Sequence, residues 1–314
     1  MTDVTVTSSN VARVRVPGGR KKKAVGHHGF AGFLFTAPFM VLFLLVFIAP
    51  LAYALYLSLF REQLIGGNTF VGLDNYVDGL KDQAFIDGIQ RVAVYMLIQV
   101  PIMLILALIF ALILDSGRVW LAKFLRVGIF VPYAVPVVIA ALMWGYIYGK
   151  DFGPFADIAD KLGVAAPSFL SEQTMLFSLA NVATWTYTGY NMIILYAALR
   201  SIPTELYEAA AVDGAGPVST AWHIKLPLLR PALLLCTIFS VIGSFQLFGE
   251  PRIFYALAPD VIGKDYTPNL YVYNLAFADQ RLNYAAALSF LLGAVVFVIS
   301  YVVMYSSRRQ EAAR

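Results

Sequence analysis

Long runs of apolar residues dominate the chain, and shorter polar stretches separate them. A helix needs about 20 consecutive apolar residues to cross a membrane, because each residue rises about 1.5 Å and the hydrocarbon layer is about 30 Å thick. Six runs approach or exceed this length, and the sequence predicts a membrane-spanning helix for each of them: 33–59, 92–114, 127–148, 175–199, 232–248 and 284–305. We therefore predict an all-α integral membrane protein.

The segments outside these runs define the predicted domain organisation. Residues 1–29 are polar and contain a basic cluster from Arg20 to Lys23, so we expect a disordered basic tail. Residues 30–306 form the predicted membrane domain, and residues 307–314 form a second short tail.

Basic residues are distributed unevenly between the two sides that six spans would create. Of the 23 Lys and Arg residues, 15 fall in the two tails and in the loops 115–126 and 200–230, and eight fall in the loops of the opposite side. An excess of Lys and Arg marks the cytoplasmic side of a membrane protein. We therefore expect a multi-pass protein of the cell membrane with both termini in the cytoplasm.

Composition supports the membrane assignment and narrows the chemistry. The chain is 60% hydrophobic and 13% charged, and the charged fraction is about half that of a typical soluble protein. The single cysteine, Cys236, lies inside an apolar run, and the three histidines lie apart from any carboxylate or cysteine cluster, so we expect no metal site. No nucleotide-binding or hydrolase motif is visible, so we expect no enzyme activity, no cofactor and no nucleic-acid partner.

One polar stretch on the predicted cytoplasmic side, residues 203–231, contains signals for short helices. Pro203 suits a first helical turn, and Gly214 is typical of a residue that ends a helix. The pattern predicts one helix of about ten residues and a second from Val218 to Leu226 that ends at Pro227. Such a segment either lies on the membrane surface as an amphipathic connector or binds a cytoplasmic partner. The pattern alone leaves both interpretations open.

The spacing within this stretch is specific. Glu208, Ala209 and Ala210 are followed after three residues by Gly214, after nine more by Ile224, and after one more by Leu226 and Pro227. This spacing resembles the EAA loop of ABC importer permeases. Over residues 30–306 the chain looks like the carbohydrate-uptake branch, which includes the larger maltose permease subunit; further similar stretches are residues 70–76, 213–216 and 270–277. The resemblance implies a type I ABC importer permease bundle of six transmembrane helices with a short cytoplasmic coupling helix.

The resemblance also implies partners and roles. The coupling helix of this family docks on a cytoplasmic ATPase subunit, with Glu208 as the charged contact, Ala209 and Ala210 allowing close approach, and Gly214 giving the turn. The other coupling positions are Asp213, Ile224, Leu226 and Pro227. The implied partners are a second permease subunit in a heterodimer, two ATPase subunits that carry ATP and Mg, and an extracytoplasmic sugar-binding protein. One departure is Ala-Leu-Ala-Pro-Asp at 256–260, where the family has a Thr-Gly-Gly-Gly-Pro type of turn, so we expect a differently shaped outer gate.

Polar and aromatic side chains within two predicted spans are candidates for substrate contact, because polar groups in a span usually face a cavity or another helix. Hydroxyl and amide groups beside aromatic rings suit a sugar, which has hydroxyls at its rim and C–H groups on its faces. The same residue types also join helices to one another, so packing is the alternative for each. The candidates are Thr186, Tyr187, Tyr190, Asn191, Phe239, Ser240, Gly243 and Gln246.

The sequence therefore favours a permease subunit that imports a di- or oligosaccharide by alternating access. One alternative is the same machinery acting on a polyol or a glycerophosphodiester. Another is an ion-coupled carrier or channel, although no Asp, Glu, Lys or Arg lies within the six predicted spans. A membrane-embedded enzyme is a third alternative, for which the spans offer no paired acids or nucleophile.

Overall fold

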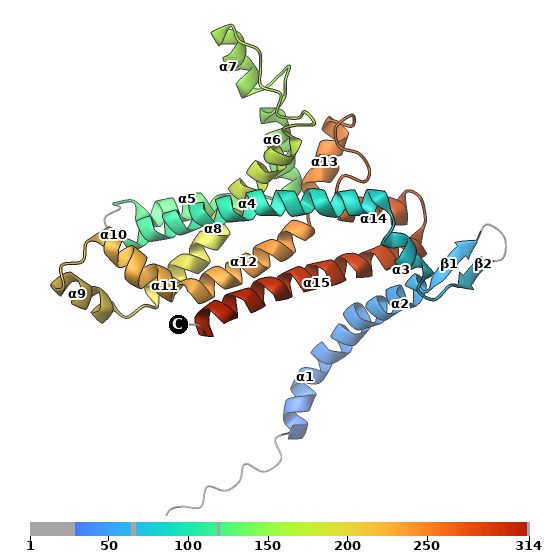
Figure 1. Cartoon of the computed structure of the whole chain (residues 1–314), viewed down its shortest axis with the longest axis horizontal. Helices are drawn as coiled ribbons and strands as arrows, with labels where there is room; N and C mark the ends of the chain where they lie inside the picture. Colours follow the sequence, from blue (N-terminus) through green and yellow to red (C-terminus); the bar gives the residue numbers. More distant parts are fainter. Residues whose placement is uncertain (1–28, 64–66, 118–119, 313–314) are drawn as a thin grey trace, which may run out of the picture. The chain divides into compact units, whose positions relative to one another are not determined.

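The computed structural model describes residues 29–63, 67–117 and 120–312 (Figure 1). The predicted N-terminal tail lies outside the described residues, apart from Gly29. The described residues divide into two compact units at the bond between Ala52 and Tyr53. The predicted first span corresponds to helix α1 (Gly29–Phe43), a π-helical segment η1 (Leu44–Ile48) and helix α2 (Ala49–Ser58).

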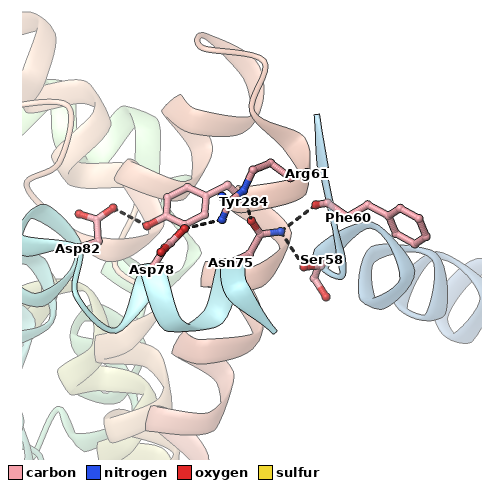
Figure 2. Close-up of polar contacts among 7 residues, drawn as sticks. All are labelled: Ser58, Phe60, Arg61, Asn75, Asp78, Asp82 and Tyr284. Carbon is pink, nitrogen blue, oxygen red and sulfur yellow. Dashed lines mark hydrogen bonds and ion pairs between the residues drawn. The ribbon is translucent and has the colours of Figure 1, made fainter. Parts of the chain in front are cut away.

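The structure confirms the predicted helical fold class, and the polar segment after the first span adds the only strands among the described residues. Strands β1 (Phe60–Gln63) and β2 (Gly67–Phe70) form an antiparallel hairpin, followed by helix α3 (Asp74–Gly79). The buried side chain of Asn75 holds the hairpin, because its amide donates to the carbonyl oxygens of Ser58 and Phe60 at 2.9 and 2.8 Å (Figure 2). An ion pair of 2.5 Å between Arg61 and Asp78 adds a second, more exposed link.

Helix α4 (Gln83–Asp115) begins nine residues before the predicted second span. Asp82 caps it by accepting from the Phe85 amide, and its other carboxylate oxygen accepts from Tyr271 and Tyr284, each at 2.8 Å. One face of α4 is buried at intervals of three or four residues, and the opposite face exposes Leu97, Ile105 and other aliphatic side chains. This is the pattern of a spanning helix with one packed face and one face toward lipid.

The third predicted span is two helices rather than one. Helices α5 (Ala122–Ala134) and α6 (Val137–Ile147) meet at an angle of 97°. The break falls at Val135 and Pro136, since the residue before a proline is disfavoured in helical conformation and Val135 is extended. A short helix α7 (Pro154–Leu162) follows.

Helix α8 (Met175–Arg200) agrees with the fourth predicted span and packs against α4 and α5. Gly189 permits the close approach to α5, because a Cβ atom at this position would lie 2.0 Å from the Ile129 carbonyl oxygen. Small residues at such crossings are typical of membrane helices.

The last part of the chain contains two further long helices with short helices between them. Helix α12 (Arg230–Phe245) ends three residues before the predicted end of the fifth span, and α13 (Gly249–Leu257) and α14 (Pro268–Phe277) occupy the predicted loop. Helix α15 (Leu282–Ala312) packs against α12, α14 and α3. It extends beyond the predicted end at residue 305, so most of the predicted C-terminal tail is helical.

By length and apolarity, three described helices qualify as membrane spans. Two further pairs of helices, each bent sharply at a short break, would raise the number to five if each pair is counted as one span. The second bent pair consists of residues 217–228 and helix α12, at 64°. Helix α8 has 26 residues, which is long enough to cross a membrane, but its polar residues make it less apolar than the others. A count of six is consistent with these helices and stays a prediction.

Candidate functional site

A cavity of about 570 Å³ lies among helices α4, α5, α8, α12 and α13. Its lining includes Tyr187, Tyr190 and Asn191 from α8 and Phe239, Ser240, Gly243 and Gln246 from α12 and its C-cap. Seven of the eight residues predicted as substrate contacts thus line one cavity. That they contact a substrate stays a prediction.

Thr186, the eighth candidate, is not in the cavity lining. Its side chain is buried, and its hydroxyl donates to the Val182 carbonyl oxygen at 2.9 Å within the same helix. A threonine can satisfy its hydroxyl in this way without any partner outside its own helix. Its burial favours packing, the alternative that the sequence left open, and a substrate contact at Thr186 stays a prediction.

Aromatic rings form one side of the cavity. The ring of Tyr133 from α5 stacks on Tyr190 with centroids 4.8 Å apart, and it meets Tyr187 edge-on at 6.0 Å. Phe239 and Tyr187 are 51% and 40% exposed, so their rings are free to pack against a bound molecule. Flat apolar surfaces of this kind suit the C–H faces of a sugar ring, and the nearby Asn191, Ser240 and Gln246 can form hydrogen bonds to hydroxyls.

Sequence reasoning missed several lining residues, and Glu250 in the first turn of α13 is the most consequential. Its side chain is 6% exposed. Burial raises the pKa of the Glu250 carboxyl, with a smaller opposing effect from a backbone hydrogen bond. No Lys, Arg or His is among the described residues that line the cavity. The position of Glu250, two residues after a predicted span, was the available signal.

Helix α4 contributes Tyr95, Gln99 and Met103 to the same cavity, and these residues were also missed. The amide of Gln99 donates to the sulfur of Met103 at 3.2 Å, and the amide of Asn191 donates to the same sulfur at 3.6 Å. A glutamine inside an otherwise aliphatic run is a signal for an inward-facing position. The contact between Asn191 and Met103 joins α8 to α4.

The polar stretch at residues 203–231 forms the predicted short helix, α9 (Thr204–Val212), with Pro203 at its N-cap. The amide of Ala215 donates to Ala210 at 2.9 Å, and that of Gly214 donates to Ala211 at 3.1 Å, with Gly214 at φ +78°. This is a Schellman motif, which needs glycine at the left-handed position. Glu208, Ala209 and the C-cap residue Asp213 are exposed, whereas Ala210 is buried.

The second half of the stretch is helical up to Leu228, so the predicted end at Pro227 is one residue early. It consists of α10 (Pro217–Thr220), the π-helical segment η2 (Ala221–Lys225) and α11 (Leu226–Leu228). Ile224, Leu226 and Pro227 are half-buried. Apolar side chains around α9 and α10 are exposed: Leu206, Val212, Val218 and Trp222.

A family model described as binding-protein-dependent transport system inner membrane component matches residues 103–312, more than half of the chain. The chain belongs to this family. It is 30% identical over 275 residues to the arabinooligosaccharides transport system permease protein AraP of Bacillus subtilis, which covers 87% of each chain. It is 30% identical over 289 residues to the lactose transport system permease protein LacF of Rhizobium radiobacter, which covers 89% of this chain and 95% of LacF.

Among solved structures, the fold matches a chain of a bacterial ABC transporter involved in the import of the acidic polysaccharide alginate. The TM-score is 0.77 at 20% sequence identity, and the match covers 89% of this chain and 96% of the other. The protein is therefore a permease subunit of an ABC importer in the inner membrane, and the resemblance seen in the sequence is confirmed.

Proposed function

We propose that this permease imports an uncharged di- or oligosaccharide by alternating access, with ATP hydrolysed on a separate subunit. The cavity carries the proposal: it combines exposed aromatic rings with amide and hydroxyl groups and contains no basic side chain among its described lining residues. The buried carboxylate of Glu250 accepts hydrogen bonds from hydroxyls and repels anions when ionised. The names of AraP and LacF, an arabinooligosaccharide and a lactose permease protein, support the same substrate class.

Helix α9 is the proposed contact with the ATPase subunit. Glu208 is exposed, and no hydrogen bond or ion pair of its carboxylate occurs within the described residues. Beside it, Leu206 and Val212 expose apolar surface outside the spans. A nine-residue helix with such a surface is poorly stable alone in water and gains stability from a docking partner. Asp213, Gly214, Ile224, Leu226 and Pro227 shape the turn and the second half of this coupling segment.

The proposed assembly has a second permease subunit, two cytoplasmic ATPase subunits carrying ATP and Mg, and an extracytoplasmic sugar-binding protein. Both termini of this chain are proposed to lie in the cytoplasm, which the distribution of Lys and Arg supports.

Uptake by the assembled importer in proteoliposomes tests the substrate class. The probes are a radiolabelled neutral disaccharide, a uronic-acid disaccharide, a glycerophosphodiester and a polyol. We expect ATP-dependent uptake of the neutral sugar. Preference for one of the other solutes would contradict the substrate class, and uptake that a protonophore abolishes while ATP is present would indicate an ion-coupled carrier.

The coupling role is tested by Glu208→Lys and Gly214→Pro. The first reverses the proposed charged contact, and the second places a residue with φ near −65° where the chain requires +78°. We expect both variants to insert in the membrane and to lose sugar uptake. Glu205→Lys is the matched control, because Glu205 is also exposed on α9. Normal uptake in both coupling variants would refute the role of α9.

A further inference from the structure

A buried ion pair joins the coupling segment to the helix that lines the cavity. Lys225, the last residue of η2, lies with its Nζ 2.5 Å from Oδ2 of Asp115, the last residue of α4. The two side chains are only 15% and 6% exposed. An ion pair withdrawn from water in this way resists separation far more than an exposed pair, because either charge left alone would be buried without a partner.

Helix α9 contacts the same pair through Tyr207. The Lys225 ammonium lies 5.0 Å from the centroid of the Tyr207 ring, within the range of a cation–π interaction. Tyr207 directly precedes Glu208, the proposed ATPase contact. The Tyr207 hydroxyl is buried and has no hydrogen-bond partner among the described residues. Burial, followed by the Asp115 charge, raises the pKa of the Tyr207 phenol, so the ring stays neutral beside the cation.

Helix α4 continues this connection to the cavity. It runs without a break from Asp115 to the lining residues Met103, Gln99 and Tyr95. The segment that holds Lys225 is π-helical, a geometry that often occurs at functional positions in helices. Tyr207, Lys225 and Asp115 therefore form a short chain of contacts between the docking helix and one wall of the cavity.

We propose that Asp115, Lys225 and Tyr207 are positioning residues that transmit the displacement of α9 to α4 and thereby couple the ATPase to the cavity. This inference rests on the proposed role of α9. The Asp115–Lys225 pair keeps the end of α4 attached to the coupling segment, and the Tyr207 ring keeps α9 attached to the lysine.

The test measures the movement of α4 directly in the assembled importer. The single cysteine, Cys236, is fully buried, so spin labels can be placed at Leu97→Cys on α4 and Phe297→Cys on α15, which are 68% and 71% exposed. We expect ATP binding to shift the distance between the labels in the otherwise unmodified protein. Lys225→Met, Asp115→Asn and Tyr207→Ala are expected to abolish the shift, while Tyr207→Phe, which retains the ring, preserves it.

Two further variants separate coupling from folding. The exchanged pair Asp115→Lys with Lys225→Asp restores opposite charges and is expected to recover the shift. Lys123→Met removes an exposed lysine near the start of α5 and is expected to leave the shift unchanged. The sugar imported per ATP hydrolysed is expected to fall at least about fivefold in Lys225→Met, while the ATPase subunits still co-purify.

The inference would be overturned if ATP binding changed the label distance in Lys225→Met and Asp115→Asn by as much as in the wild type. Loss of ATPase co-purification in these variants would also overturn it, because the pair would then serve assembly alone. The label distance does not depend on the transported solute, so failure of this inference is distinguishable from failure of the proposed sugar specificity.

Discussion

The ring of Tyr133 on α5 lies against the ring of Tyr190 on α8, with centroids 4.8 Å apart and planes inclined by 22°. This pair forms part of the aromatic side of the cavity and holds α5, one helix of the bent α5–α6 pair, against α8. Because the rings stack on each other, a sugar that packs against Tyr190 also depends on Tyr133 for the orientation of that surface.

Replacing Tyr190 with alanine is expected to weaken sugar uptake while leaving complex assembly intact. A loss of about 1 kcal/mol, the scale of aromatic stacking, corresponds to roughly a fivefold rise in the apparent Michaelis constant. Gln246→Ala, which removes a polar lining group, is expected to act in the same direction. Tyr301→Ala is the control, since Tyr301 also stacks on neighbouring rings but lies on α15 outside the cavity lining. Unchanged uptake in both cavity variants would contradict the site.

Gly243 offers a way to fill the cavity without disturbing the packing. A Cβ atom at this position meets no atom within 4 Å, although Gly243 lines the cavity. Gly243→Leu is expected to reduce uptake of a trisaccharide at least about tenfold and that of a disaccharide less, because the added side chain occupies substrate space. Gly293→Leu on α15 has equally empty surroundings and should transport normally. Equal uptake of both sugars by Gly243→Leu and the wild type would place the translocation path elsewhere.

The raised pKa of Glu250 predicts a pH-dependent stability difference. Burial disfavours the charged carboxylate in the folded state, so ionisation of Glu250 lowers the free energy of unfolding. This decrease is absent below about pH 4.3, the ordinary pKa of a glutamate, and it grows with pH until the pH passes the raised pKa of the folded state. Glu250→Gln is therefore expected to unfold at a higher temperature than the wild type at pH 8, with the difference vanishing near pH 4. Thermal unfolding in detergent measures it, with Glu172→Gln as a control for loss of an exposed carboxylate. A constant difference across the pH range would exclude ionisation as its cause.

The hairpin anchor at Asn75 predicts a local stability effect. Asn75→Ala leaves the Ser58 carbonyl without its side-chain donor, whereas the Phe60 carbonyl retains the amide of Asn283 at 3.1 Å. The expected cost is about 1–3 kcal/mol, seen as a lower unfolding temperature and faster proteolysis within residues 60–82. Asn68→Ala, on the exposed face of β2, should change neither measurement. If the two variants behave alike, Asn75 does not anchor the hairpin.

The sequence by itself determined the apolar runs and the short helix α9, because both depend on local properties. Span length follows from hydropathy, and the end of α9 follows from the left-handed conformation that Gly214 adopts more readily than other residues. Spacing along α8 and α12 also placed seven candidates on faces that meet in one cavity, since helical periodicity relates positions three or four apart.

Only the tertiary structure decided which face of each span is packed. Apart from Gln99, helix α4 is apolar on all sides from Val92 to Leu114. Because lipid is as apolar as a protein core, hydropathy alone does not distinguish the exposed Leu97 from Tyr95, which lines the cavity. Helix α13 packs against α6, and this placement brings Glu250, which lies outside the predicted spans, into the cavity. The pairing of Lys225 with Asp115 likewise depends on a contact between segments distant in the chain, which hydropathy does not record.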